Sequence, residues 1–173
     1  PAMDILKSSN IERVIFDLFG STRTKELMEN LNKNNIFTMT QDETKELQKY
    51  FSATFSNDSF GNTTIKEFLD SGYLMDPHTA TCIKAYNDLR EKPLKTVIYS
   101  TAEWTKFSPT VLNALNQDSK KYSDKEALEE ISTKFGATLP KSIKNLFSAK
   151  INHSSVINKE NIESEIIKFI RKS

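Results

Sequence analysis

Residues 73–107 read YLMDPHTATCIKAYNDLREKPLKTVIYSTAEWTKF. Asp76 precedes Pro77, the order of an N-cap residue followed by a proline at the first helical position, so we predict a helix of about four turns from Pro77 to near Arg90. The next segment, Lys95–Ser100, contains Thr-Val-Ile-Tyr without polar alternation. Such a run is typical of a strand covered on both faces in a parallel sheet, and we predict one strong strand there.

Short capped helices are predicted on both sides of this stretch. Ser or Thr followed three residues later by Glu, the signature of a capping box, occurs at Ser9, Thr40, Thr64 and Ser123. Apolar residues recur behind each at helical spacing. The predicted helices are 11–20, 22–32, 40–51 and 64–71 before the stretch, and 109–115, 123–135, a short one from 140, and 158–170 after it. The fold class is therefore mainly α with one strong strand.

The single predicted strand has no obvious partner in this chain. A strand without a neighbour cannot satisfy its backbone amides and carbonyls, so either a second, weaker strand exists or the neighbouring strands are missing. The sequence starts at Pro1 rather than at a methionine. We therefore expect that the natural chain begins earlier and that the missing neighbours belong to that earlier part.

Composition excludes several classes of function. The chain has 24 Lys and Arg against 23 Asp and Glu, so no basic face suggests nucleic acid. No apolar run approaches the ~20 residues of a membrane helix, and no signal peptide is recognisable. These observations predict a cytoplasmic protein. The chain contains only 4 glycines, which form no glycine-rich loop that could hold a phosphate.

Few side chains are candidates for chemistry. His78 and His153 are too far apart in the sequence for a metal site, and Cys82 stands alone, so we expect no metal and structural roles for all three. Ser100 and Thr101 follow the predicted strand, at the position where open α/β sheets present side chains to ligands. Because every such sheet has several strand ends, the position alone indicates a site only weakly.

The order of these pieces resembles threonine synthase of the bacterial and fungal type. The resemblance lies in Asp76–Ala80 at the helix start and in Ser100–Phe107 after the strand, with support from Pro1–Ile5, Ser8–Arg13 and Leu139–Lys141. It implies an α/β parent enzyme with the tryptophan synthase β-like fold, dependent on pyridoxal 5'-phosphate. It also implies that this chain is the C-terminal portion, and that the Schiff-base lysine and the loop for the cofactor phosphate belong to the preceding half.

The resemblance also implies roles for individual residues. Thr101 matches the hydroxyl residue that hydrogen-bonds the pyridine nitrogen of the cofactor, and Ser100 and Ala102 flank it. Asp76 and His78 match the helix start near the cofactor, although His78 is equally well explained as a residue that bonds to backbone. Lys106 matches a family lysine that could meet an anionic group, or it is simply solvated.

One tripeptide departs from the pattern of the family. Glu103–Thr105 replaces the His-Pro-Ala that many members carry, and we expect its Trp104 to pack rather than to contact the cofactor. The departure puts in doubt any role that depends on the family histidine.

The parent enzyme implied by the resemblance converts O-phospho-L-homoserine and water to L-threonine and phosphate. Within this chain we predict two segments of that enzyme. The first is helical and covers 1–92, and the second covers 93–173 and contains the strand, the cofactor-facing loop and the last helices. The fragment alone is expected to be inactive and to need the N-terminal part of the same enzyme as its partner.

Two other interpretations stay open at this point. One is a sister enzyme of the same fold type, such as a threonine dehydratase or cysteine synthase. The other is a self-standing helical binding module without catalysis, because capped amphipathic helices serve any helical domain. Exposed apolar surface distinguishes the two classes, since a fragment should expose the patch where the absent sheet packed.

Overall fold

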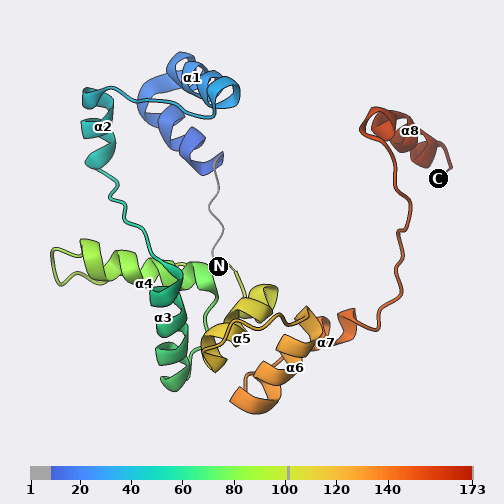
Figure 1. Ribbon diagram of the computed structural model, residues 1–173. Coiled ribbons are helices and arrows are strands. Elements are labelled where there is room, and N and C mark those ends of the chain that lie inside the picture. Colours follow the sequence, from blue (N-terminus) through green and yellow to red (C-terminus); the bar gives the residue numbers. More distant parts are fainter. Residues whose placement is uncertain (1–8, 101, 173) are drawn as a thin grey trace. The chain divides into compact units, whose positions relative to one another are not determined.

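The computed structural model describes residues 9–100 and 102–172, and this part of the chain contains helices and no strand (Figure 1). Most helices are short, and each begins close to a cap residue or a proline. The elements are α1 (Ser9–Asn34), α2 (Gln41–Gln48), α3 (Asp58–Asp70), α4 (Pro77–Leu89), η1 (Trp104–Phe107), α5 (Ser108–Asn116), α6 (Asp124–Phe135), α7 (Lys141–Leu146), η2 (Lys159–Asn161) and α8 (Ile162–Lys172).

Helix α1 is interrupted where the sequence predicts the end of one helix and the start of the next. Gly20 has φ 76° and ψ 174°, a backbone conformation that favours glycine, and the helix direction changes there. The hydroxyl of Thr24 donates to the Gly20 carbonyl at 2.8 Å, which satisfies an acceptor at the break. The predicted pair of helices is thus confirmed, joined at a kink.

A bidentate ion pair connects α1 to α2. Nε and Nη2 of Arg23 donate to the two carboxylate oxygens of Glu43 at 2.6 and 3.0 Å. Glu43 also closes the predicted capping box, because its Oε2 accepts from the Thr40 backbone at 2.7 Å. The hydrogen bonds from Arg23, followed by that from Thr40, lower the pKa of Glu43 to about 2.

The segment after α2 differs from the prediction in its burial. The sequence predicts that Tyr50 and Phe51 face inward on a helix that continues through them, but α2 ends at Gln48 and both aromatic side chains are exposed. The helix is only eight residues long and buries no side chain completely, so packing does not extend it.

Helices α3 to α6 share an apolar core. Helix α3 packs against α4 and α5, and α5 packs in turn against α6 and η1. Helix α3 begins at Asp58 rather than at the predicted Thr64, because Asn57 caps it by accepting from the Phe60 amide at 2.9 Å. The fully buried apolar side chains of this core include Ile65, Met75, Ala80, Val111, Leu112, Ala127 and Ile131.

The predicted strand over Lys95–Ser100 is wrong for the described part of this chain. Residues 95–100 have no regular secondary structure, and the side chains of Val97 and Tyr99 are 77% and 78% exposed. The physical reason is the lack of a pairing partner, because a strand is stable only when a neighbouring strand satisfies its backbone groups. The apolar sequence pattern suits a strand buried in a sheet, and the described residues contain no such sheet.

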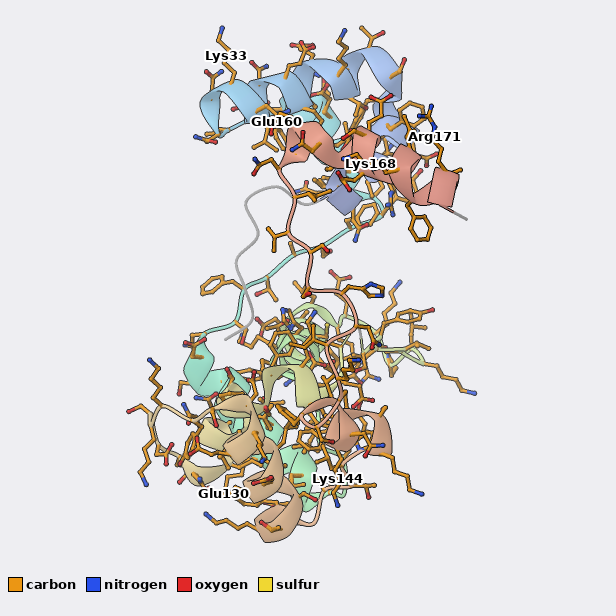
Figure 2. The ribbon with its side chains drawn as sticks, turned by 90° about the vertical axis from the view of Figure 1, so that its right-hand side faces the viewer. Lys33, Glu130, Lys144, Glu160, Lys168 and Arg171 are labelled. Atoms are coloured by element: carbon orange, nitrogen blue, oxygen red, sulfur yellow. The ribbon has the colours of Figure 1, made fainter. Side chains whose placement is uncertain are left out.

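The chain divides into two compact units, 1–138 and 139–173. The second unit contains α7 and α8. Helix α7 begins beside the predicted start at 140, whereas the predicted start at 158 is followed by the 3-10 turn η2 and α8 begins only at Ile162. Glu160 lies in η2, and Lys168 and Arg171 lie in the second half of α8, so acidic and basic side chains stand at the ends that the helix dipole favours (Figure 2). The apolar side chains of α8 are exposed, including Ile162, Ile166, Phe169 and Ile170.

No helix in the described part of the chain is long and apolar enough to cross a membrane. The sequence prediction of two segments that meet at 92/93 stays a prediction.

Candidate functional site

Asp76 caps helix α4 with both of its carboxylate oxygens. Oδ1 accepts from the backbone amides of His78 and Thr79 at 2.9 and 3.3 Å, and Oδ2 accepts from the Thr79 hydroxyl at 2.5 Å. The Asp76 residue is only 1% exposed. A buried carboxylate is stable when hydrogen bonds and the positive end of a helix compensate its charge, and the first turn of α4 provides both. The predicted cap and helix start are confirmed.

The hydroxyl of Ser100 lies against this cap. Its Oγ is 3.4 Å from Oδ2 of Asp76, 3.2 Å from Oγ1 of Thr79 and 3.0 Å from the carbonyl oxygen of Ala102. Each hydroxyl carries one proton, so Thr79 donating to Asp76 and Ser100 donating to Ala102 are the two shortest bonds that can exist together. The contact joins the start of α4 to the end of the irregular segment 95–100.

His78 is held by its surroundings rather than directed at open space. Its ring packs on Phe107 with 4.7 Å between centroids and a 51° angle between the planes. Nδ1 is buried and 3.4 Å from Oδ1 of Asp76, but without the geometry of a hydrogen bond. These contacts agree with a structural role at the helix start.

The other residues predicted to belong to the site differ in how far they are buried. Ala102 is half-buried, and Lys106 is exposed with its Nζ 5.4 Å from the centre of the Phe107 ring. Thr101 lies outside the described residues, as do the matching strings at Pro1–Ile5 and at Ser8. Trp104 is buried in the core, as expected of packing.

Sequence reasoning left one residue of this cluster without a role. Thr79 is buried and donates to Asp76, and its Oγ1 also touches Ser100. The signal that could have found it is its position three residues after the N-cap, where a hydroxyl can meet the capping carboxylate.

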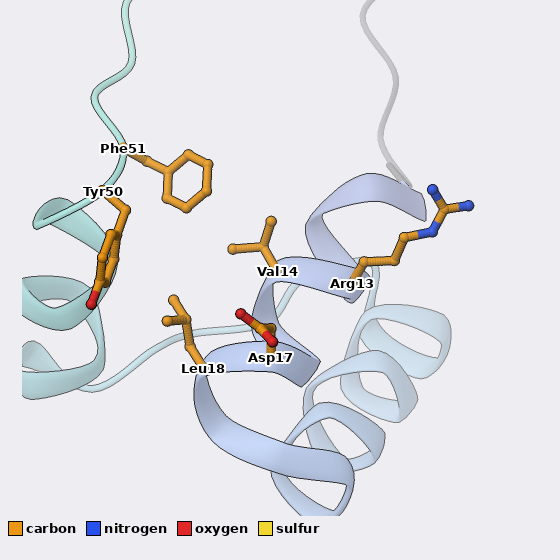
Figure 3. A pocket seen from close by; sticks show the side chains of 6 residues that line it. All are labelled: Arg13, Val14, Asp17, Leu18, Tyr50 and Phe51. Carbon is orange, nitrogen blue, oxygen red and sulfur yellow. The ribbon is translucent and has the colours of Figure 1, made fainter.

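Pockets in the described part of the chain also lie outside this cluster. Figure 3 shows one of about 420 Å³ between the first half of α1 and the residues after α2, where Val14, Leu18, Tyr50 and Phe51 give it an apolar wall and Arg13 and Asp17 a charged edge. A second pocket, of about 540 Å³, is lined by residues from 48–52 and 85–96. Neither pocket includes a residue that the sequence predicts to bind the cofactor.

Comparisons with known proteins identify relatives along the whole chain. The threonine synthase of Saccharomyces cerevisiae is 29% identical over 188 aligned positions, which include 97% of this chain. The structure of threonine synthase from Brucella melitensis with bound pyridoxal phosphate matches all of this chain with a TM-score of 0.72 and 26% identity. The chain is homologous to threonine synthases. The resemblance seen in the sequence is confirmed.

Further relatives support the homology, and all of them are longer than the matched region. Threonine synthase of Pseudomonas aeruginosa and human threonine synthase-like 1 are each 33% identical over 66% of the chain. The chain spans 36% of the Saccharomyces cerevisiae protein, 25% of the Pseudomonas aeruginosa protein and 16% of the human protein. It also covers 34% of the solved Brucella melitensis chain. No family model matches the sequence.

The described residues of this threonine synthase homologue offer polar groups that could meet one edge of a cofactor ring, and no cradle for a phosphate group. Ser100, Thr79 and Asp76 form a polar edge beside half-buried Ala102. In contrast, a Cβ added to any of the four glycines would have no atom within 4 Å, so no glycine marks a close approach of backbone to a ligand. The described residues contain no cluster of His, Cys, Asp and Glu that could hold a metal ion.

Proposed function

We propose that this chain is the C-terminal part of a threonine synthase that converts O-phospho-L-homoserine and water to L-threonine and phosphate in the cytoplasm. The observation that carries the proposal is the match of the entire chain to a threonine synthase structure with bound pyridoxal phosphate, at a TM-score of 0.72. The near-complete alignment with the Saccharomyces cerevisiae enzyme supports it independently.

In this proposal the loop at 100–102 forms one wall of the cofactor site. Bound pyridoxal phosphate supplies an electron sink for the reaction. The resemblance assigns Thr101 as the residue whose hydroxyl would donate to the ring nitrogen without placing a full positive charge there, and Ser100 and Ala102 would line the ring. Asp76 supports this loop rather than contacting the cofactor, because its oxygens accept hydrogen bonds from the first turn of α4 and lie near Ser100.

His78 and Lys106 rank below the loop residues as ligands. His78 is packed on Phe107 beside the Asp76 cap, which suits a residue that supports the wall. Lys106 is exposed, and an exposed lysine near a helix start is commonly solvated.

The isolated chain is proposed to be inactive. A threonine synthase needs a lysine that binds the cofactor and a loop that holds its phosphate, and the resemblance assigns both to the preceding half of the enzyme. The N-terminal part of the enzyme is therefore the partner, and O-phospho-L-homoserine is the substrate of the assembled protein.

The alternatives have less support. Nothing in the site favours a threonine dehydratase or a cysteine synthase over the homology to threonine synthases. A self-standing helical module should cover its apolar side chains, whereas here Leu94, Val97 and Tyr99 are exposed. This exposure supports a piece of a larger protein.

A chimera tests the proposal. The matched 36% of the Saccharomyces cerevisiae threonine synthase is replaced by this chain, and phosphate release from O-phospho-L-homoserine is measured. We expect release, and a roughly fivefold loss in Thr101→Val, because one hydrogen bond of ~1 kcal/mol in the transition state has that effect. Thr105→Val, which removes a hydroxyl outside the proposed wall, is the matched control and should keep the rate.

A folded chimera that binds pyridoxal phosphate but releases no phosphate would contradict the activity. Equal rates for Thr101→Val and Thr105→Val would contradict the role of Thr101.

A further inference from the structure

The pocket between the first half of α1 and the residues after α2 has a largely apolar wall. Val14 and Leu18 lie one turn apart on α1 and are half-buried, and the exposed rings of Tyr50 and Phe51 stand opposite them (Figure 3). The volume of about 420 Å³ is in the range of pockets that bind small molecules. The pocket therefore has room for a small molecule with an apolar body.

Local contacts hold both sides of this pocket. The backbone amide of Tyr50 and that of Phe51 each donate to the Leu47 carbonyl at 3.1 Å, which fixes the two aromatic residues to the end of α2. The bidentate ion pair of Arg23 with Glu43 in turn holds α2 against α1. Because the walls are already held, a ligand need not order them when it binds.

Asp17 supplies the charge nearest to the apolar wall. Successive residues of a helix are about 100° apart, so Asp17 lies between Arg13 and Val14 around α1. Nη1 of Arg13 donates to Oδ1 of Asn10 at 3.3 Å, one turn toward the start of the helix, and Figure 3 shows this side chain directed away from the aromatic rings. Among residues 9–100 and 102–172, no hydrogen bond or ion pair occupies the Asp17 carboxylate.

A carboxylate beside aromatic rings favours a cation. The face of an aromatic ring attracts positive charge, an attraction that proteins use to recognise organic ammonium groups. The carboxylate adds a charge-assisted hydrogen bond from an N–H of the ligand. An anion would be repelled both by the ring faces and by Asp17. Because Asp17 is the one acidic residue among the described residues that line the pocket, a single positive charge gives the best charge balance.

We propose that this pocket binds a small monocationic amine with an apolar body. The ammonium group lies at Asp17, and the apolar body lies between the aromatic rings and the side chains of Val14 and Leu18. Because Asp17 is exposed, its ion pair is weak, and we expect a Kd on the order of 1 mM. No residue proposed above as a cofactor ligand lines the pocket, so the proposal does not depend on the proposed function.

The test compares three probes of similar size that differ in charge. Phenethylammonium carries the proposed cation, phenethyl alcohol is neutral, and hydrocinnamate is an anion. Each probe is titrated at neutral pH into the 173-residue chain, and NMR shifts of the backbone amides of Val14, Asp17 and Phe51 report binding. We expect the ammonium probe to bind about fivefold more tightly than the alcohol, and the anion to bind most weakly.

A matched pair of variants tests the role of Asp17. Asp17→Asn removes the charge at nearly constant size, so it should weaken binding of the ammonium probe about fivefold and leave the alcohol unchanged. Glu12→Gln is the control, because Glu12 is an exposed acid of the same helix that lines a different pocket, and it should change neither affinity. Phe51→Ala should weaken both probes, since both contact the apolar wall.

Three results would overturn the proposal. Equal affinities for the ammonium probe and the alcohol, or equal losses in Asp17→Asn and Glu12→Gln, would show that no cation site exists. Absence of binding by all three probes would show that the pocket takes no ligand of this size. If phenylalanine binds more tightly than phenethylammonium and loses that advantage in Arg13→Gln, the ligand is a zwitterion that uses Arg13, and the monocation is wrong.

Discussion

Oγ of Ser100 lies 3.4 Å from Oδ2 of Asp76, although the two residues are 24 positions apart in the sequence. The contact links the cap of α4 to the loop that carries the candidate cofactor residues. Because Asp76 is buried and its oxygens also bind the first turn of α4, the position of the loop depends on the integrity of this helix start.

The cap at Asp76 should be important for stability. Asp76→Ala leaves the amides of His78 and Thr79 without their acceptor, and we expect the free energy of unfolding to fall by ~1–2 kcal/mol. Urea unfolding followed by circular dichroism measures the loss. Asp70→Ala, at the exposed C-terminal end of α3, is the control and should change the stability by less than ~0.5 kcal/mol. Equal effects of the two changes would show that the cap is unimportant.

The Glu43 carboxylate should make stability depend on pH in the acid range. Its pKa is lowered to about 2 in the folded chain by Arg23, against ~4.3 for an unfolded glutamate. A lowered folded pKa means that the stabilisation is fully present above ~4.3 and is lost as the pH falls toward 2. The stability difference between the unmodified chain and Glu43→Gln should therefore shrink over this range.

Unfolding of both proteins at several pH values checks this dependence. Glu29→Gln is the control, because Glu29 is exposed and its contact with Lys25 is 3.8 Å long. A difference for Glu43→Gln that stays constant down to pH 2 would contradict the role of the ion pair with Arg23.

The shared core of α3 to α6 should be sensitive to lost volume. Leu112 in α5 is completely buried, and Leu112→Ala should reduce the free energy of unfolding by ~2–5 kcal/mol because it removes packed atoms and leaves a cavity. Leu146→Ala, on an exposed leucine of α7, should have an effect below ~1 kcal/mol. Chemical unfolding of the two variants compares them, and a small effect at Leu112 would contradict the packing of α5.

The start of α6 offers a test of a predicted cap. Ser123 accepts from the Glu126 amide, and Glu126 accepts from the Ser123 amide at 2.9 Å. Ser123→Ala should destabilise the chain by ~1 kcal/mol, measured by thermal unfolding, whereas Ser119→Ala in the preceding exposed loop should not. The same loss at both serines would mean that the capping box contributes nothing specific.

The helices could be predicted from the sequence because their signals are local. Asp76-Pro77, Ser123 with Glu126, and Gly20 each act on backbone groups within four residues, and all three were placed correctly. The start of α3 was missed because Asn57 and Thr64 are both acceptable caps, and the choice between them depends on tertiary packing.

The failure of the predicted strand could not be foreseen from the sequence of this chain alone. The pattern at Lys95–Ser100 reports that the residues suit a buried strand, but pairing needs a neighbour that lies outside the local sequence. The candidate site, too, could be predicted only in part from the sequence. The resemblance placed Asp76 and Ser100 near one cofactor, which stays a prediction, whereas the contacts of Thr79 with both residues follow only from the three-dimensional arrangement.

The central claim is that this chain works as one part of a threonine synthase. The most direct measurement is phosphate release from O-phospho-L-homoserine by the purified 173-residue chain, alone and in complex with the unmatched part of the Saccharomyces cerevisiae enzyme, with pyridoxal phosphate present. We predict no release by the chain alone and clear release by the complex. Release by the chain alone, or a stable complex that binds pyridoxal phosphate and stays inactive, would contradict the claim.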